Sequence, residues 1–166
     1  MRGATIVLSC AVALVASLAP SSSAVPASAR RAHVTHVTDG DTAYLRPLRY
    51  GDTAQSWPGR SARFIGVDTP ETYGDDECFG PQASAFTERK LEGRRVKVTY
   101  GEDPQDPYGR ALIYVWRKGR LFNATLVRRG FATVLIIPPN DRYENKLRRL
   151  QAAARAAGRG LWSACR

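Results

Sequence analysis

The sequence has few of the residues from which zinc sites and nucleophilic catalytic sites are usually built. Its 166 residues include two histidines, His33 and His36, and three cysteines. It contains no Cys-x-x-Cys pair and no P-loop motif, which argues against a zinc site and against a nucleoside triphosphate-binding loop. Neither histidine lies near a serine or cysteine motif. We interpret both histidines as strand residues.

Acidic residues are also scarce relative to basic ones. The chain has 25 Lys and Arg against 15 Asp and Glu, a formal net charge of +10. Because clustered Lys and Arg attract phosphate or an anionic surface, this balance points to a polyanionic partner. With 43% hydrophobic and 9% aromatic residues, the composition is that of a globular chain, and the length suits one domain.

Only the N-terminus carries a long apolar run. Arg2 precedes the apolar residues 4–18, and small residues then lead to Ala29, which is the order of a secretory signal ending in an Ala-x-Ala site. About 15 apolar residues are fewer than the roughly 20 needed to span a bilayer. We therefore expect a signal peptide at residues 1–29, cleaved after Ala29 or, as second choice, after Ala24. The mature protein should be secreted, extracellular and without stable membrane association.

Removal of residues 1–29 leaves a basic chain with two cysteines. Only Arg2 is lost among the charged residues, so 24 Lys and Arg remain against 15 acids, a net charge of +9. Cys78 and Cys165 form an even pair, and in an oxidising compartment such a pair favours a disulfide over a metal site. Two inert thiols are the alternative.

Short β-prone segments dominate the first half of the mature chain. Strict alternation or short apolar runs identify the strands, and the Asp39-Gly40 pair has the turn chemistry of a hairpin between the first two. The predicted strands are 32–38, 42–48, 63–67, 96–100 and 111–116. These five could form one sheet or barrel.

Three helices are predicted around these strands. Pro81 and Gly93 bracket the first, 81–92, as expected for a helix start and stop. The second is short, with Phe122 and Leu126 on one face, and ends at Gly130. The third runs from Asp141 to Gly158, where Asp141-x-x-Glu144 resembles a capping box.

Charged groups concentrate in three short segments, 38–42, 63–72 and 106–110. Each segment alone is unremarkable, because Asp-Gly turns and Thr-Pro-Glu loop starts are common. Together they supply two carboxylates, Asp41 and Asp68, whose hard oxygens suit Ca²⁺ or Mg²⁺.

The same segments supply a candidate base and two phosphate ligands. Glu71 lies three residues after Asp68 and could orient or deprotonate a water molecule. Arg63 and Arg110 offer planar, permanently charged forks for phosphate oxygens. A metal and two arginines would neutralise the charge that builds up on a phosphate, so the residues fit metal-assisted phosphodiester hydrolysis.

These motifs, in this order, resemble the staphylococcal nuclease (thermonuclease) family over nearly all of residues 32–163. The resemblance is carried by residues 37–42, 63–72, 80–87, 108–110, 123–130 and 160–162. It implies an α+β, mainly β fold, a five-stranded OB-type barrel with three α-helices in one nuclease domain, 30–166. It also implies a secreted, Ca²⁺-dependent endonuclease that acts on DNA and RNA and leaves 3′-phosphate ends. We expect it to be a monomer.

The resemblance also implies a role for each motif residue. In the metal site, Asp41 and Asp68 would be carboxylate ligands, Thr69 a main-chain carbonyl ligand and Asp39 an outer neighbour. On the phosphate and nucleotide side, Glu71 would position or activate the attacking water, Arg63 and Arg110 would bind phosphate, and Tyr108 would lie at the nucleotide pocket.

The sequence departs from the family's type member at two places. Residues 135–139 are aliphatic and proline-rich, where the type member has tyrosines that help to hold the nucleotide. Cys78 and Cys165, which the type member lacks, could tie the approach to the first helix to the C-terminus.

Two other classes of protein fit part of the sequence. A non-catalytic nucleic-acid-binding OB domain would use the basic charge, but carboxylates facing phosphate would give it no advantage. A cationic protein acting on membranes would need an amphipathic helix with large exposed apolar residues, and residues 151–157 are rich in alanine instead.

Overall fold

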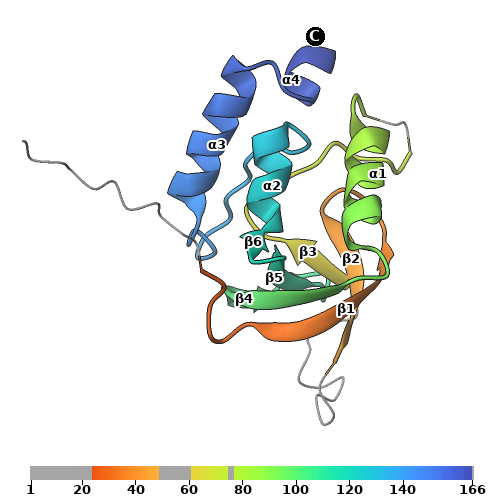
Figure 1. The fold of residues 1–166 in the computed structure, drawn as a ribbon, viewed down its shortest axis with the longest axis vertical. Coiled ribbons are helices and arrows are strands. Elements are labelled where there is room, and N and C mark those ends of the chain that lie inside the picture. The colour runs from red at the N-terminus through yellow and green to blue at the C-terminus, as the bar shows by residue number, and fades with distance from the viewer. Residues whose placement is uncertain (1–23, 49–60, 75–76, 166) are drawn as a thin grey trace, which may run out of the picture.

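The computed structural model describes residues 24–48, 61–74 and 77–165 (Figure 1). Most of the predicted signal peptide, residues 1–29, therefore lies outside the described residues. At its end, the Ala29 N–H donates to the Pro26 carbonyl at 3.0 Å, and Val25 packs against the core. None of the helices in the described ranges is long and apolar enough to cross a membrane.

Within the described residues, six strands form one sheet that closes on itself. They are β1 (Arg30–Val37), β2 (Thr42–Pro47), β3 (Ser61–Phe64), β4 (Arg95–Gln105), β5 (Ala111–Arg117) and β6 (Arg120–Leu121). The strand order is β3-β2-β1-β4-β5-β6, and β3 also pairs with β5. That last pairing is parallel and the others are antiparallel. The five-stranded OB-like barrel expected from the sequence is thus confirmed, with β6 as a short addition.

The apolar pattern of β5 follows from its central place in the barrel. β5 pairs with β4 on one side and β3 on the other, and Ile113, Tyr114, Val115 and Trp116 are all at most 2% exposed. A strand covered on both faces has no solvent side, so it reads as a continuous apolar run and not as an alternation.

The helices lie together on one side of the barrel (Figure 1). They are α1 (Gly80–Leu91), α2 (Phe122–Arg129), α3 (Glu144–Ala156) and α4 (Leu161–Ala164). The three predicted helices are confirmed, and the four-residue α4 is a fourth that the sequence did not indicate. Stacked aromatic rings join α1 to α2 and to the segment that follows it: the Phe86 ring lies 4.3 Å from that of Phe131 and 6.0 Å from that of Phe122.

The predicted capping box at the start of α3 is wrong. Tyr143 is the N-cap residue, and no side chain caps the helix. Asp141 instead accepts a hydrogen bond from the Glu144 N–H through its main-chain carbonyl, at 2.8 Å. The Glu144 carboxylate accepts from Arg148 Nε at 2.6 Å, an i,i+4 pair that takes it away from the helix start.

A disulfide joins Cys78 to Cys165, as predicted. Their Cα atoms are 5.8 Å apart, and 87 positions separate them in the chain. Cys78 lies in the turn that leads into α1, and Cys165 follows α4. The bridge therefore attaches the last helix to the segment that leads into the first.

We predict that replacing both cysteines, Cys78→Ser with Cys165→Ser, lowers the free energy of unfolding by about 2 to 4 kcal/mol. A crosslink over so long a loop restricts the unfolded chain strongly, although the measured effect is often smaller than the entropy model gives. Urea denaturation of the oxidised protein and the double variant measures the difference, and the reduced wild type is the control. Equal midpoints for all three would show that the bridge does not stabilise the fold.

Candidate active site

Asp41 is a buried carboxylate at the turn between β1 and β2. The residue is 1% exposed, and a buried charge is tolerated only where hydrogen bonds and an opposite charge compensate it. Its Oδ2 accepts from the Thr69 N–H at 2.7 Å and from the Thr69 hydroxyl at 3.1 Å. Its Oδ1 accepts from the Thr42 hydroxyl at 3.2 Å and pairs with Arg63 Nη1.

Arg63 brings the two predicted metal carboxylates together. Its Nη1 pairs with Asp41, and its Nη2 lies 2.6 Å from Asp68 Oδ1. The side chains of Arg63 and Asp68 are 15% and 46% exposed. One guanidinium thus bridges a buried carboxylate and a carboxylate that solvent can reach.

The close packing of the β1–β2 turn requires Gly40. A Cβ on this residue would lie 2.6 to 2.7 Å from the Thr69 side chain, which hydrogen bonds to Asp41. On α1, the Thr87 hydroxyl donates to the Gly40 carbonyl at 2.6 Å. The sequence indicates a glycine turn here, but the structural reason is this close approach. Thr87 was not among the predicted site residues.

Asp39 lies next to the Asp41 carboxylate and supports the β1–β2 turn. Its Oδ1 accepts from the Asp41 N–H at 3.0 Å. Burial raises the pKa of the Asp39 carboxyl, while the charge of Arg63 acts in the opposite direction.

A single β-bridge fixes the main chain at Asp68. The Asp68 N–H donates to the Thr133 carbonyl at 3.0 Å, and the Thr133 N–H donates to the Asp68 carbonyl at 2.8 Å. Thr133 follows α2 in the loop that leads towards α3. Sequence reasoning missed it because an isolated bridge between segments 65 residues apart leaves no periodic pattern.

Glu71 is exposed and is held through its main chain. Its N–H donates to Glu77 Oε2 at 3.0 Å, and its carbonyl accepts from the Glu77 N–H at 3.0 Å. A Cβ on Gly80 would lie 2.5 Å from that carbonyl. Partial burial raises the pKa of the Glu71 carboxyl, and the negative charge of Asp39 raises it further, while the charge of Arg63 lowers it.

Arg110 is fixed by Asp106 at the turn between β4 and β5. Its Nε lies 2.6 Å from Asp106 Oδ2, and its main-chain N–H donates to Asp106 Oδ1 at 2.8 Å. Burial alone would raise the pKa of Asp106, but the hydrogen bonds from Arg110 lower it. The sequence shows Asp106 as part of a turn motif, and an Asp that starts a turn often accepts main-chain N–H groups in this way.

Arg63 and Arg110 line one cleft of about 270 Å³. Tyr108, which is 85% exposed, lies in the same lining, and its ring centroid is 5.5 Å from the Arg110 guanidinium carbon. Leu135 and Ile137 add an apolar wall and are 42% and 65% exposed. The aliphatic segment that distinguishes this sequence is therefore part of the cleft.

The donor set at Asp41 and Asp68 suits a hard divalent cation. No group of three or more His, Cys, Asp or Glu side chains that could hold a metal occurs in the described ranges. Two carboxylates would need main-chain carbonyl, water and phosphate oxygens to complete the coordination, which Ca²⁺ and Mg²⁺ accept and structural zinc does not.

Comparison with known proteins agrees with this geometry. Residues 61–164 match the family model described as staphylococcal nuclease homologue. A thermonuclease of Staphylococcus intermedius is 35% identical over 132 residues, which are 78% of this chain and 74% of that protein, and one of Staphylococcus hyicus is 35% identical over 133 residues with the same coverage. Endonuclease YhcR of Bacillus subtilis (strain 168) is 33% identical over 142 residues, 11% of its length. With the closed barrel and the clustered acids and arginines, these matches establish that the chain belongs to the staphylococcal nuclease family and is homologous to the thermonucleases.

Proposed function

We propose that the protein is a secreted, Ca²⁺-dependent endonuclease that hydrolyses phosphodiester bonds of DNA and RNA and leaves 3′-phosphate ends. The observation that carries this proposal is the convergence of Asp41 and Asp68 on the guanidinium of Arg63, an arginine that lines one cleft together with Arg110. Membership of a family with thermonucleases among its members supports it.

Asp41, Asp68 and the main-chain carbonyl of Thr69 are the proposed Ca²⁺ ligands, with Asp39 as an outer neighbour. A bound Ca²⁺ would neutralise charge on the phosphate oxygens and make a bound water more acidic. Arg63 uses both terminal nitrogens on the two carboxylates, so it can give them to a phosphate only when the carboxylates have another partner. Cation binding and phosphate binding by Arg63 are therefore coupled.

Glu71 is the proposed general base. Its exposed carboxylate would take a proton from water as the water oxygen bonds to phosphorus. The bond from phosphorus to the 5′ oxygen would break, and that oxygen would take up a proton from solvent to leave as a 5′-hydroxyl. Arg63 and Arg110 would stabilise the charge on the phosphate oxygens. Tyr108, Leu135 and Ile137 offer the apolar and aromatic surface against which sugar and base can pack.

A binding-only OB domain is the alternative function. It would gain nothing from a carboxylate that is 1% exposed beside a phosphate-binding arginine, because burying such a charge is costly. The disulfide supports the proposed secretion, since disulfides persist in oxidising compartments. A monomer is proposed as well.

The direct test is cleavage by the purified chain without residues 1–29. We expect it to cut single-stranded DNA and RNA with Ca²⁺ present, to lose this activity in chelator, and to yield 3′-phosphate ends by end-group analysis. Tight binding without any cleavage under Ca²⁺ would favour the binding-only alternative. Full activity in chelator would contradict the metal assignment.

We predict that Glu71→Gln lowers kcat by about 10² to 10⁴, the usual contribution of a positioned general base. KM should change little, because the amide keeps the shape of the side chain and binding does not need the base. Steady-state cleavage of one oligonucleotide by wild type and variant gives both constants. Wild-type turnover in the variant would remove Glu71 from the mechanism.

We predict that Arg110→Lys is strongly impaired although it keeps the charge. Lysine loses the planar fork and the Nε contact with Asp106, so phosphate would no longer be bound in two places. The matched control is Arg148→Lys, since Arg148 lies on α3 and also pairs through Nε with a carboxylate, that of Glu144. Comparable small losses of kcat/KM in both variants would mean that Arg110 contributes only general positive charge.

A further inference from the structure

A second hollow of about 430 Å³ lies between α1, α2 and the turn from β5 to β6. Its lining contains six cationic residues and no carboxylate: Lys90, Arg117, Lys118, Arg120, Arg128 and Arg129. We call these six residues the basic groove. Within the described ranges, no ion pair involves any of them. Like charges brought together without counter-ions repel one another, so fold stability does not account for the groove.

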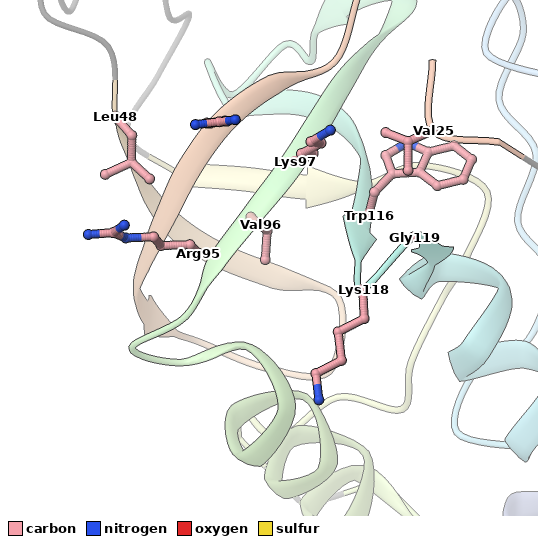
Figure 2. A pocket seen from close by; sticks show the side chains of 9 residues that line it. Val25, Leu48, Arg95, Val96, Lys97, Trp116, Lys118 and Gly119 are labelled. Atoms are coloured by element: carbon pink, nitrogen blue, oxygen red, sulfur yellow. The ribbon is translucent and has the colours of Figure 1, made fainter. Parts of the chain in front are cut away.

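The positive surface continues beyond Lys118. This residue also lines a neighbouring hollow with Arg31, Arg95 and Lys97, and that lining again contains no acid. Figure 2 shows Arg95 and Lys97 along β4 and the Lys118 side chain extending from the end of β5. Val25, which is labelled in the same view, belongs to the segment predicted to be cleaved after Ala29. The four cations of this hollow come after that segment, so they remain in the mature chain.

The cleft lined by Arg63 and Arg110, which we call the catalytic cleft because both proposed phosphate ligands line it, is by contrast balanced in charge. Two arginines, Arg63 and Arg110, line it together with two acids, Asp103 and Asp106. Strand β5 begins beside Arg110 and ends at Arg117, and seven residues at about 3.3 Å each put the groove roughly 20 Å from the cleft. The unbalanced positive charge is therefore away from the proposed reaction.

The packing of the groove holds its cations close together. Lys90 Nζ of α1 lies 5.8 Å from the Phe86 ring centroid, and the guanidinium carbon of Arg129 in α2 lies 5.5 Å from the same centroid. A ring face attracts cations, so this one buried phenyl group gathers charges from two helices. Phe86 is only 2% exposed and offers no apolar surface to a ligand.

We propose that the basic groove is a second nucleic-acid-binding site, which holds the sugar–phosphate backbone of a long strand without regard to sequence. The groove would hold one part of the strand while another part occupies the catalytic cleft. To that extent the proposal rests on the proposed nuclease function. Two attachment points on one strand raise the effective concentration of the substrate at the cleft. The groove should therefore matter for long strands and not for very short ones.

The lining favours a nucleic acid over a lipid surface. A membrane-binding face needs large apolar side chains exposed beside its cations. The exposed large hydrophobic residues in the described ranges are Tyr44, Tyr73, Tyr108, Leu135 and Ile137, and none of them lines the groove. A concave lining whose charged residues are all cationic suits a phosphate backbone.

Two triple variants of equal charge test the proposal. Lys90→Gln, Arg120→Gln and Arg128→Gln together remove three groove cations from α1, the start of β6 and α2. Arg46→Gln, Arg142→Gln and Arg155→Gln together remove three exposed cations that do not line the groove. Circular dichroism and urea denaturation confirm that both are folded. Binding to a labelled deoxythymidine strand of about 30 nucleotides is measured by fluorescence anisotropy in chelator, over a range of salt.

The groove variant should bind the long strand at least about tenfold more weakly at low salt, and its slope of log K against log salt should be shallower by about 2. The control variant should stay close to wild type. With Ca²⁺ present, the groove variant should show a higher KM for the long strand and wild-type kcat/KM for a trinucleotide, which is too short to reach from cleft to groove.

Equal long-strand affinity and equal salt slopes in the two triple variants would overturn the proposal. A second result would also overturn it. If the groove variant binds the strand like wild type but no longer binds vesicles of phosphatidylglycerol, the groove is a lipid site. Because binding is measured in chelator, failure of the nuclease function would leave this result intact: a protein that cuts nothing but shows the predicted loss of binding still has the groove.

Discussion

The buried carboxylate of Asp41 is the interaction on which the rest of the site depends. It receives hydrogen bonds from Thr69 and Thr42 and an ion pair from Arg63, so it joins the β1–β2 turn, strand β3 and the segment after β3. Removing any one donor would leave a charge in a poorly solvated place. The Asp41 carboxylate thus sets both the geometry of the proposed metal site and the position of Arg63, a proposed phosphate ligand.

The sequence predicted most of the fold because the elements are locally consistent. The alternating strands, the Asp-Gly hairpin and the Pro-to-Gly bracket around α1 all have short-range signals. The capping box failed because its side chain found a better partner, Arg148, one turn into the helix. The four-residue α4 gave no signal of its own, since a helix that short has no hydrophobic period to detect.

The candidate site was predictable where its residues carry chemistry and not where they only give support. Asp41, Arg63, Asp68 and Thr69 are in contact as the motifs suggested. Thr87, Thr133 and the paired role of Asp106 were missed. Each supports a site residue, or the turn that carries one, through a hydrogen bond, in two cases from a remote part of the chain. Such long-range pairings leave no spacing that a single sequence reveals.

The tight packing of two glycines has a consequence for how this protein tolerates mutation. A side chain at Gly40 would collide with Thr69, and one at Gly80 would collide with the main chain of Glu71. Neither glycine has a functional group, yet each lies beneath a residue that does. In a scan of all single substitutions, both positions would score as intolerant as the acids they adjoin. Such a map would report the shape of the supporting backbone as well as the location of the chemistry.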